Sequence, residues 1–162
     1  MSCLQRPEGD GLRARLVDRI SDLDELVEEL KKSSEEIGAI CIFIGVVRGI
    51  SSGKRVLRLE YEAHEKLAPE VLAKLLEEAK ARHGIIDGAI EHKVGSAGVG
   101  ELVMCVAVAS RHRQEAFRAL EELVNAVKHK APIWKKEVTE EGAYWVEAKP
   151  EEAGQGQSNH RR

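Results

Sequence analysis

Two stretches of the chain, residues 38–47 (GAICIFIGVV) and 101–109 (ELVMCVAVA), are apolar on both alternating faces. A strand with one wet face alternates apolar and polar residues, whereas an unbroken apolar run is typical of a central strand covered on both faces. Both runs are far shorter than the roughly 20 residues that a helix needs to span a bilayer. The sequence therefore predicts a soluble domain built around two buried strands.

The composition is sufficient for one core. Of the 162 residues, 43% are hydrophobic and 33% are charged, which favours a single globular domain. Only 4% are aromatic, so aliphatic side chains are expected to fill most of the core. We predict one domain over residues 1–150 and a polar, disordered tail over residues 151–162 (EEAGQGQSNHRR).

The spacing of apolar residues along the rest of the chain predicts the other strands and helices. The expected strands cover residues 13–19, 38–47, 55–62, 86–94 and 101–109, with a C-terminal hairpin of 133–139 and 143–148. The expected helices cover residues 22–32, the segment from Pro69 to Gly84, and the segment from Ser110 to Ala131. Because strands and helices mix without strict alternation, the predicted fold class is α+β. We expect a mainly antiparallel sheet with helices packed on one side.

Short segments between these elements carry further expectations. Ser21 precedes Asp24 at capping-box spacing, and Ser110 is placed to cap the last helix. Residues 48–54 (RGISSGK) are expected to form a mobile loop, and the glycine-rich segment 95–100 (GSAGVG) a plain hairpin connection.

Several classes of function are disfavoured. The net charge of −3 argues against a general nucleic-acid binder. The three cysteines (Cys3, Cys41 and Cys105) form no C-x-x-C pair, which fits a reducing, cytoplasmic compartment without a zinc or disulfide framework. Cys41 and Cys105 are expected to be buried and inert. The N-terminus lacks the apolar stretch of a signal peptide, and the histidines show no metal-ligand spacing, so we expect neither metal nor cofactor.

Residues 111–136 are locally basic, with seven lysines and arginines against three acidic residues. Such a region on an acidic protein suggests an anionic ligand. The alternative is that Lys128 and Lys130 merely complement the C-terminal end of a helix. Both interpretations are open on these grounds.

A helical wheel adds a constraint on this region. Arg113 and Lys128 project within or beside the apolar stripe of Phe117, Leu120, Leu123, Val124 and Val127. They either snorkel at the two helix ends or face an anion. Fifteen residues at about 1.5 Å each separate them by about 22 Å, so the pair from one copy cannot touch one small ligand. If both bind it, they meet across a two-fold dimer.

Longer motifs give the sequence its resemblance to a known family. Residues 38–149 resemble the catalytic (large) subunit of molybdopterin synthase, through the segments GAICIFIGVVR, LRLEYEAHEKLA, SRHRQEAF, KHKAPIWKKE and GAYWVEAK, in that order. The resemblance implies an α/β-hammerhead fold and a sulfurtransferase of molybdenum cofactor biosynthesis. The implied partner is a small ubiquitin-like subunit with a C-terminal Gly-Gly thiocarboxylate, bound at each end of a homodimer to give a heterotetramer. The implied substrate is cyclic pyranopterin monophosphate, converted to the molybdopterin dithiolene.

The resemblance also implies the site residues. By position they are the catalytic pair Lys128 and Lys135 and the substrate-binding residues Arg48, His112, Arg113 and Lys149. The His-Arg pair and Lys149, which stands where many members have arginine, are expected to come from the other copy of the dimer. The loop 49–54 lacks the asparagine common in the family, and His64 stands where tyrosine is frequent.

These roles suit the chemistry, because the substrate phosphate and the thiocarboxylate are both anions that fixed cations must hold together. We expect Lys128 to position the thiocarboxylate and the acyl intermediate formed after sulfur attack, with the other cations on the phosphate and pterin. A lysine crowded by cations should have a lowered pKa, which permits proton transfer.

Two other functions compete with this one. A non-catalytic adaptor would bind the Gly-Gly tail without converting the pterin, and an RNA- or phosphate-binding domain would use the basic helix. For Trp134, core filling is preferred over stacking on a pterin.

Overall fold

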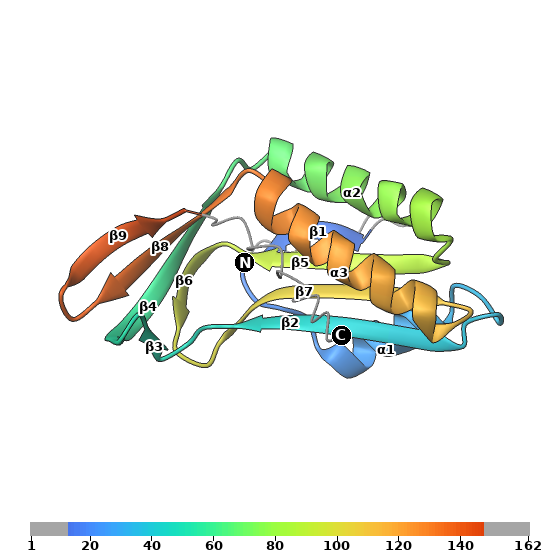
Figure 1. The fold of residues 1–162 in the computed structure, drawn as a ribbon, viewed down its shortest axis with the longest axis horizontal. Helices are drawn as coiled ribbons and strands as arrows, with labels where there is room; N and C mark the ends of the chain where they lie inside the picture. Colours follow the sequence, from blue (N-terminus) through green and yellow to red (C-terminus); the bar gives the residue numbers. More distant parts are fainter. Residues whose placement is uncertain (1–12, 148–162) are drawn as a thin grey trace, which may run out of the picture.

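The computed structural model describes residues 13–147, which fold into two β-sheets and three helices (Figure 1). The strands are β1 (Arg13–Val17), β2 (Ala39–Val46), β3 (Ile50–Ser51), β4 (Lys54–Ala63), β5 (Asp87–Lys93), β6 (Gly95–Gly98), β7 (Leu102–Ser110), β8 (Ile133–Thr139) and β9 (Gly142–Val146). The helices are α1 (Leu23–Lys31), α2 (Leu67–His83) and α3 (Arg113–Lys130). The predicted tail and Lys149 lie outside the described residues. None of the described helices is long and apolar enough to cross a membrane.

The first sheet has the strand order β1-β5-β7-β2. Strand β1 runs parallel to β5 and the other neighbours are antiparallel, which confirms the expected mainly antiparallel sheet. Strand β7 is central and buried, as its apolar run predicts. The same expectation is wrong for β2, which is an edge strand with half-buried side chains, including Cys41. A run of apolar residues does not distinguish an edge strand under a helix from a central strand.

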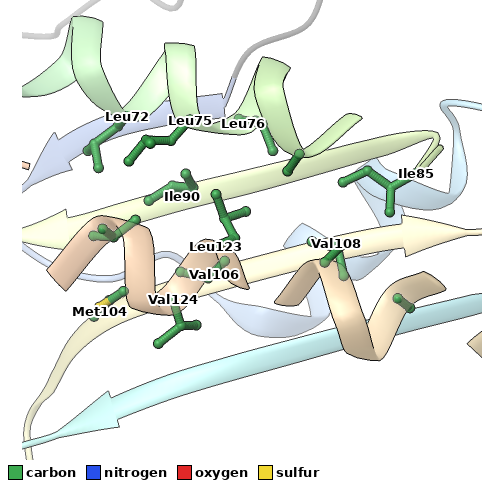
Figure 2. Close-up of a cluster of buried hydrophobic side chains, with 14 residues drawn as sticks. Leu72, Leu75, Leu76, Ile85, Ile90, Met104, Val106, Val108, Leu123 and Val124 are labelled. Carbon is green, nitrogen blue, oxygen red and sulfur yellow. The ribbon is translucent and has the colours of Figure 1, made fainter. Parts of the chain in front are cut away.

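The two long helices pack on one side of this sheet, as expected, and the short helix α1 covers the other face. Helices α2 and α3 pack on one face, where Leu76 and Leu123 meet Ile90, Val106 and Val108 (Figure 2). Helix α1 packs on the opposite face and buries Leu26 and Leu30 against residues 105, 107 and 109. Even-numbered side chains of β7 therefore pack in the core under α2 and α3, and odd-numbered ones pack in the core under α1.

The second sheet extends to one side of the first (Figure 1) and has the order β3-β4-β8-β9, with β6 also paired to β4. Strands β8 and β9 confirm the predicted hairpin. The segment 95–100 is more than the plain connection we expected, because its first four residues form β6. The segment 48–54 is likewise not a simple loop: β3 pairs with β4 through a turn at Ser52 and Gly53, both with positive φ.

Both long helices end where the sequence predicts. Gly84 adopts the left-handed conformation at the end of α2, with φ of 65°. Ala131 ends α3 immediately before Pro132, whose ring cannot continue a helix.

The predicted N-terminal caps are wrong. Asp22, and not Ser21, caps α1 by accepting a hydrogen bond from the backbone N–H of Glu25. Ser21 instead donates from its N–H and its hydroxyl to the buried carboxylate of Glu91. Ser110 is still part of β7, and His112 occupies the cap position of α3 without a capping side-chain bond. Ser21 thus bonds to a distant partner that the local sequence does not reveal, whereas the Ser110 hydroxyl donates to the carbonyl oxygen of His112, two residues along the chain.

Two aromatic side chains expected in the core are exposed. Phe117 is 61% exposed, because the first half of α3 buries Ala116 and Ala119 in place of Phe117 and Leu120. The second half is buried as predicted, at Leu123, Val124 and Val127. Trp134 is 52% exposed, because it points to the face of β8 opposite that of Lys135. The preference for a core-filling Trp134 is therefore wrong.

Candidate active site

Three of the predicted cations come from adjoining parts of the fold. Lys128 is in the last turn of α3, and Lys135 follows on β8 after a connection of only two residues. Arg48 lies two residues beyond the end of β2. Lys128 and Arg48 are exposed, whereas Lys135 is half-buried. Because α3 ends abruptly before Pro132, the chain turns back and β8 begins beside the last turn of α3.

The electrostatics of Lys135 reflect this convergence. Burial lowers the pKa of its ammonium group, and the charges of Arg48 and then Lys128 lower that pKa further. The carboxylate of Glu137 acts in the opposite direction. The expected depression of a lysine pKa is therefore present at Lys135, although burial contributes more to it than the neighbouring cations. A lowered pKa brings this amine closer to exchanging protons at working pH.

Lys128 is oriented by an aromatic ring. Its Nζ atom lies 5.8 Å from the centroid of the Phe43 ring on β2. A cation over an aromatic face at an exposed site is stabilised by about 0.5–1 kcal/mol. This contact places the Lys128 side chain over the edge strand β2, and nothing in the apolar run of that strand distinguishes Phe43 from its neighbours.

Tyr61 and His92 lie beside Lys135. Tyr61 on β4 is the direct cross-strand partner of Lys135, and its ring meets that of His92 edge-on, with centroids 4.9 Å apart. Burial raises the pKa of Tyr61 to about 12. The pKa of His92 is lowered, mainly by burial and also by the charge of Lys135. Sequence reasoning missed both residues, although a histidine within the predicted strand 86–94 was a visible signal.

A buried carboxylate completes the same face of β8. Glu137 is two residues beyond Lys135 and only 6% exposed. It accepts a hydrogen bond of 2.6 Å from the hydroxyl of Tyr144 on β9. Its negative charge stabilises the ammonium form of Lys135, so the cluster contains its own partial counter-charge.

Other predicted site residues lie elsewhere. His112 and Arg113 are exposed at the start of α3, at the opposite end of that helix from Lys128. At about 1.5 Å per residue, the backbone separation between Arg113 and Lys128 is about 22 Å. Within one chain, the structure therefore brings together Arg48, Lys128 and Lys135 but not the His-Arg pair.

The chemistry available to this cluster is anion binding with one amine of lowered pKa. Within residues 13–147, no group of three His, Cys, Asp or Glu side chains is placed to hold a metal ion. A hollow beside Tyr61 is lined further by Leu16, Glu62, Ala63, Glu65 and Val94, and it does not include the lysines. Lys128 and Arg48 are exposed, so a second molecule can approach their charged groups directly.

Comparison with known proteins assigns this chain to a family. The family model for the MoaE protein matches residues 16–130. The molybdopterin synthase catalytic subunit of Pyrococcus abyssi is 42% identical over 115 residues, which cover 71% of this chain and 78% of that protein.

Solved structures share the fold. The molybdopterin synthase structure from Staphylococcus aureus superposes with a TM-score of 0.74 at 31% identity, covering 84% of this chain and 98% of the other. A chain from the Helicobacter pylori complex of subunits 1 and 2 of molybdopterin-converting factor has a TM-score of 0.66 at 22% identity. That match covers 82% of this chain and 89% of the other.

Proposed function

Because the chain belongs to the MoaE protein family and is a catalytic subunit of molybdopterin synthase, a sulfurtransferase of molybdenum cofactor biosynthesis, we propose that sulfur transfer takes place at the cluster of Arg48, Lys128 and Lys135. The observation that carries the proposal is the convergence of Arg48 and Lys128 on the half-buried amine of Lys135. Lysines that merely complement a helix dipole would all lie at the end of one helix. The charges of this cluster instead come from three parts of the fold.

The proposed substrate is cyclic pyranopterin monophosphate, and the sulfur donor is the C-terminal thiocarboxylate of a small ubiquitin-like subunit. Both are anions, so fixed cations lower the cost of bringing them together. Lys128 positions the thiocarboxylate and the acyl intermediate that forms when the sulfur attacks the pterin precursor. Lys135 and Arg48 bind the phosphate and pterin, and Lys135 is the group best suited to exchange a proton.

The proposed assembly is a homodimer with a small subunit at each end. Support comes from the Helicobacter pylori relative, which was solved as a complex of two different subunits. The separation of about 22 Å along α3 supports the dimer. His112 and Arg113 can reach the phosphate held at Lys135 only from a second copy. Lys149 is assigned to the same partner-derived set.

Reconstitution tests the proposal. The full chain is mixed with a small partner bearing the Gly-Gly thiocarboxylate and with cyclic pyranopterin monophosphate, and the dithiolene product is measured. We expect product with the thiocarboxylate and none with the same partner ending in an ordinary carboxylate. Tail binding without any pterin conversion would instead identify a non-catalytic adaptor.

A matched pair of variants locates the chemistry. Lys128→Ala should abolish product while leaving the fold intact, because its contact with Phe43 contributes only about 0.5–1 kcal/mol. Lys130→Ala removes an equally exposed charge from the same helix turn and should leave turnover unchanged. Full turnover by Lys128→Ala would remove Lys128 from the mechanism.

A further inference from the structure

The candidate site spans a junction between the two sheets. Lys128 belongs to α3, which packs on the first sheet, whereas Lys135 belongs to β8 in the second sheet. Their relative placement therefore depends on how the two sheets are held together. The chain passes between the sheets just beyond His92: β5 ends at Lys93, and β6, which pairs with β4, begins at Gly95.

His92 is fixed at this junction. It is 7% exposed, and its Nδ1 atom lies 2.8 Å from the carbonyl oxygen of Lys93. Because a carbonyl oxygen only accepts, Nδ1 carries the proton and the neutral ring keeps its lone pair on Nε2. The ring is therefore held in one orientation, with its tautomer set by the backbone.

The ring of His92 then contacts the strand pair that carries Lys135. It meets Tyr61 at an interplanar angle of 71°, with centroids 4.9 Å apart, in the edge-to-face arrangement that aromatic rings prefer. Tyr61 and Lys135 are opposite each other in the antiparallel β4–β8 pair, so their side chains share a face. The contact between His92 and Tyr61 therefore links the first sheet to the amine of Lys135 through one side chain, that of Tyr61.

We propose that His92 is a positioning residue for Lys135. Through its edge-on contact with Tyr61, it holds the β4–β8 pair against the first sheet, so that the Lys135 ammonium faces Lys128 and Arg48. The proposal rests on the proposed function of Lys135. The charges that act on this amine come from Arg48 after β2, Lys128 on α3 and Glu137 on β8. Beside it lie Tyr61, its cross-strand partner on β4, and His92 on β5, whose own pKa is lowered in part by the charge of Lys135.

Its physical consequence can be measured on the chain alone. Burial is the main cause of the lowered pKa of Lys135. Replacing His92 with a smaller side chain opens the junction to water, and hydration of the ammonium should raise that pKa toward the usual lysine range. The chemical reactivity of a lysine amine follows its unprotonated fraction. The pH midpoint of labelling by acetic anhydride, followed at Lys135 by peptide mass spectrometry, therefore reports this environment.

Two pairs of variants test the proposal. His92→Asn keeps an N–H donor near the Nδ1 position but loses the ring, and Tyr61→Ala removes the other half of the contact. Both should move the labelling midpoint of Lys135 upward by about one pH unit and reduce kcat about tenfold or more. Tyr61→Phe preserves the ring contact, and His83→Asn alters a histidine that instead bonds to Glu122 between the helices. These two controls should keep the wild-type midpoint.

The outcomes separate the two proposals. A folded His92→Asn protein with the wild-type midpoint and kcat would overturn the positioning role. If His92→Asn does not fold, the comparison of Tyr61→Ala with Tyr61→Phe decides, and equal midpoints for those two would refute the role. Failure of the wild-type reconstitution would refute the proposed function alone, because labelling needs neither partner nor substrate.

Discussion

Mixing two inactive variants would reveal whether Arg113 acts across a dimer. Lys128 and Arg113 lie at opposite ends of α3, about 22 Å apart along the helix axis. An extended lysine and arginine together do not close such a gap around one phosphate. We therefore expect Lys128→Ala and Arg113→Ala each to be inactive alone and to complement each other when their subunits exchange.

The turnover that the mixture should recover follows from the two-fold symmetry of the dimer. Random exchange of equal amounts gives mixed dimers in about half of the population. In a mixed dimer, one site combines both replacements, and the other combines the intact Lys128 of one copy with the intact Arg113 of its partner. About one quarter of all sites are then complete, and turnover should recover to about a quarter of the wild-type value.

The assay is reconstituted dithiolene formation after subunit exchange, with each variant alone as the baseline. Mixing Lys128→Ala with Lys135→Ala is the matched control, because both replaced residues belong to the same chain's cluster and no complete site can form. No recovery in the first mixture, despite demonstrated exchange, would show that Arg113 is not supplied by the partner. Recovery in the control mixture would contradict the single-chain cluster itself.

Three further changes test the site and the fold. Lys135→Arg keeps a positive charge that does not titrate, so we expect phosphate binding to persist while kcat falls about 10²-fold in single-turnover assays; an unchanged kcat would exclude proton exchange at this position. Gly88→Ala should destabilise the protein by about 1–3 kcal/mol in urea unfolding, because a Cβ there would lie 2.6 Å from Leu76 Cδ1 and 2.9 Å from the carbonyl oxygen of Ala107. Burial alone would raise the pKa of Glu91, but hydrogen bonds from Ser21 and Arg15 outweigh it and lower that pKa. The stability this carboxylate contributes is thus present above the usual glutamate pKa of 4.5 and lost as pH falls through the lower folded value. The stability difference between wild type and Glu91→Gln should therefore shrink in acid, and a pH-independent difference would refute this linkage.

The sequence by itself determined the local features of this protein. Pro132 ends α3 because its ring disfavours the helical conformation of the residue before it, and Gly84 readily adopts the left-handed turn that terminates α2. The order and spacing of the basic motifs identified the family, which the comparisons confirm. These features depend on near neighbours in the chain, so no knowledge of distant contacts was needed.

Only the tertiary structure decided which distant residues meet. An edge strand can carry the same apolar run as a central strand. The prediction that β2 is central is therefore wrong. The hydroxyl of Ser21 donates to the carboxylate of Glu91, 70 residues away, and does not cap the nearby helix α1. The Tyr61–Lys135 pairing and the contact with His92 arise where two sheets join. Strand register is set by burial summed over many long-range contacts, and no short window of residues contains that information.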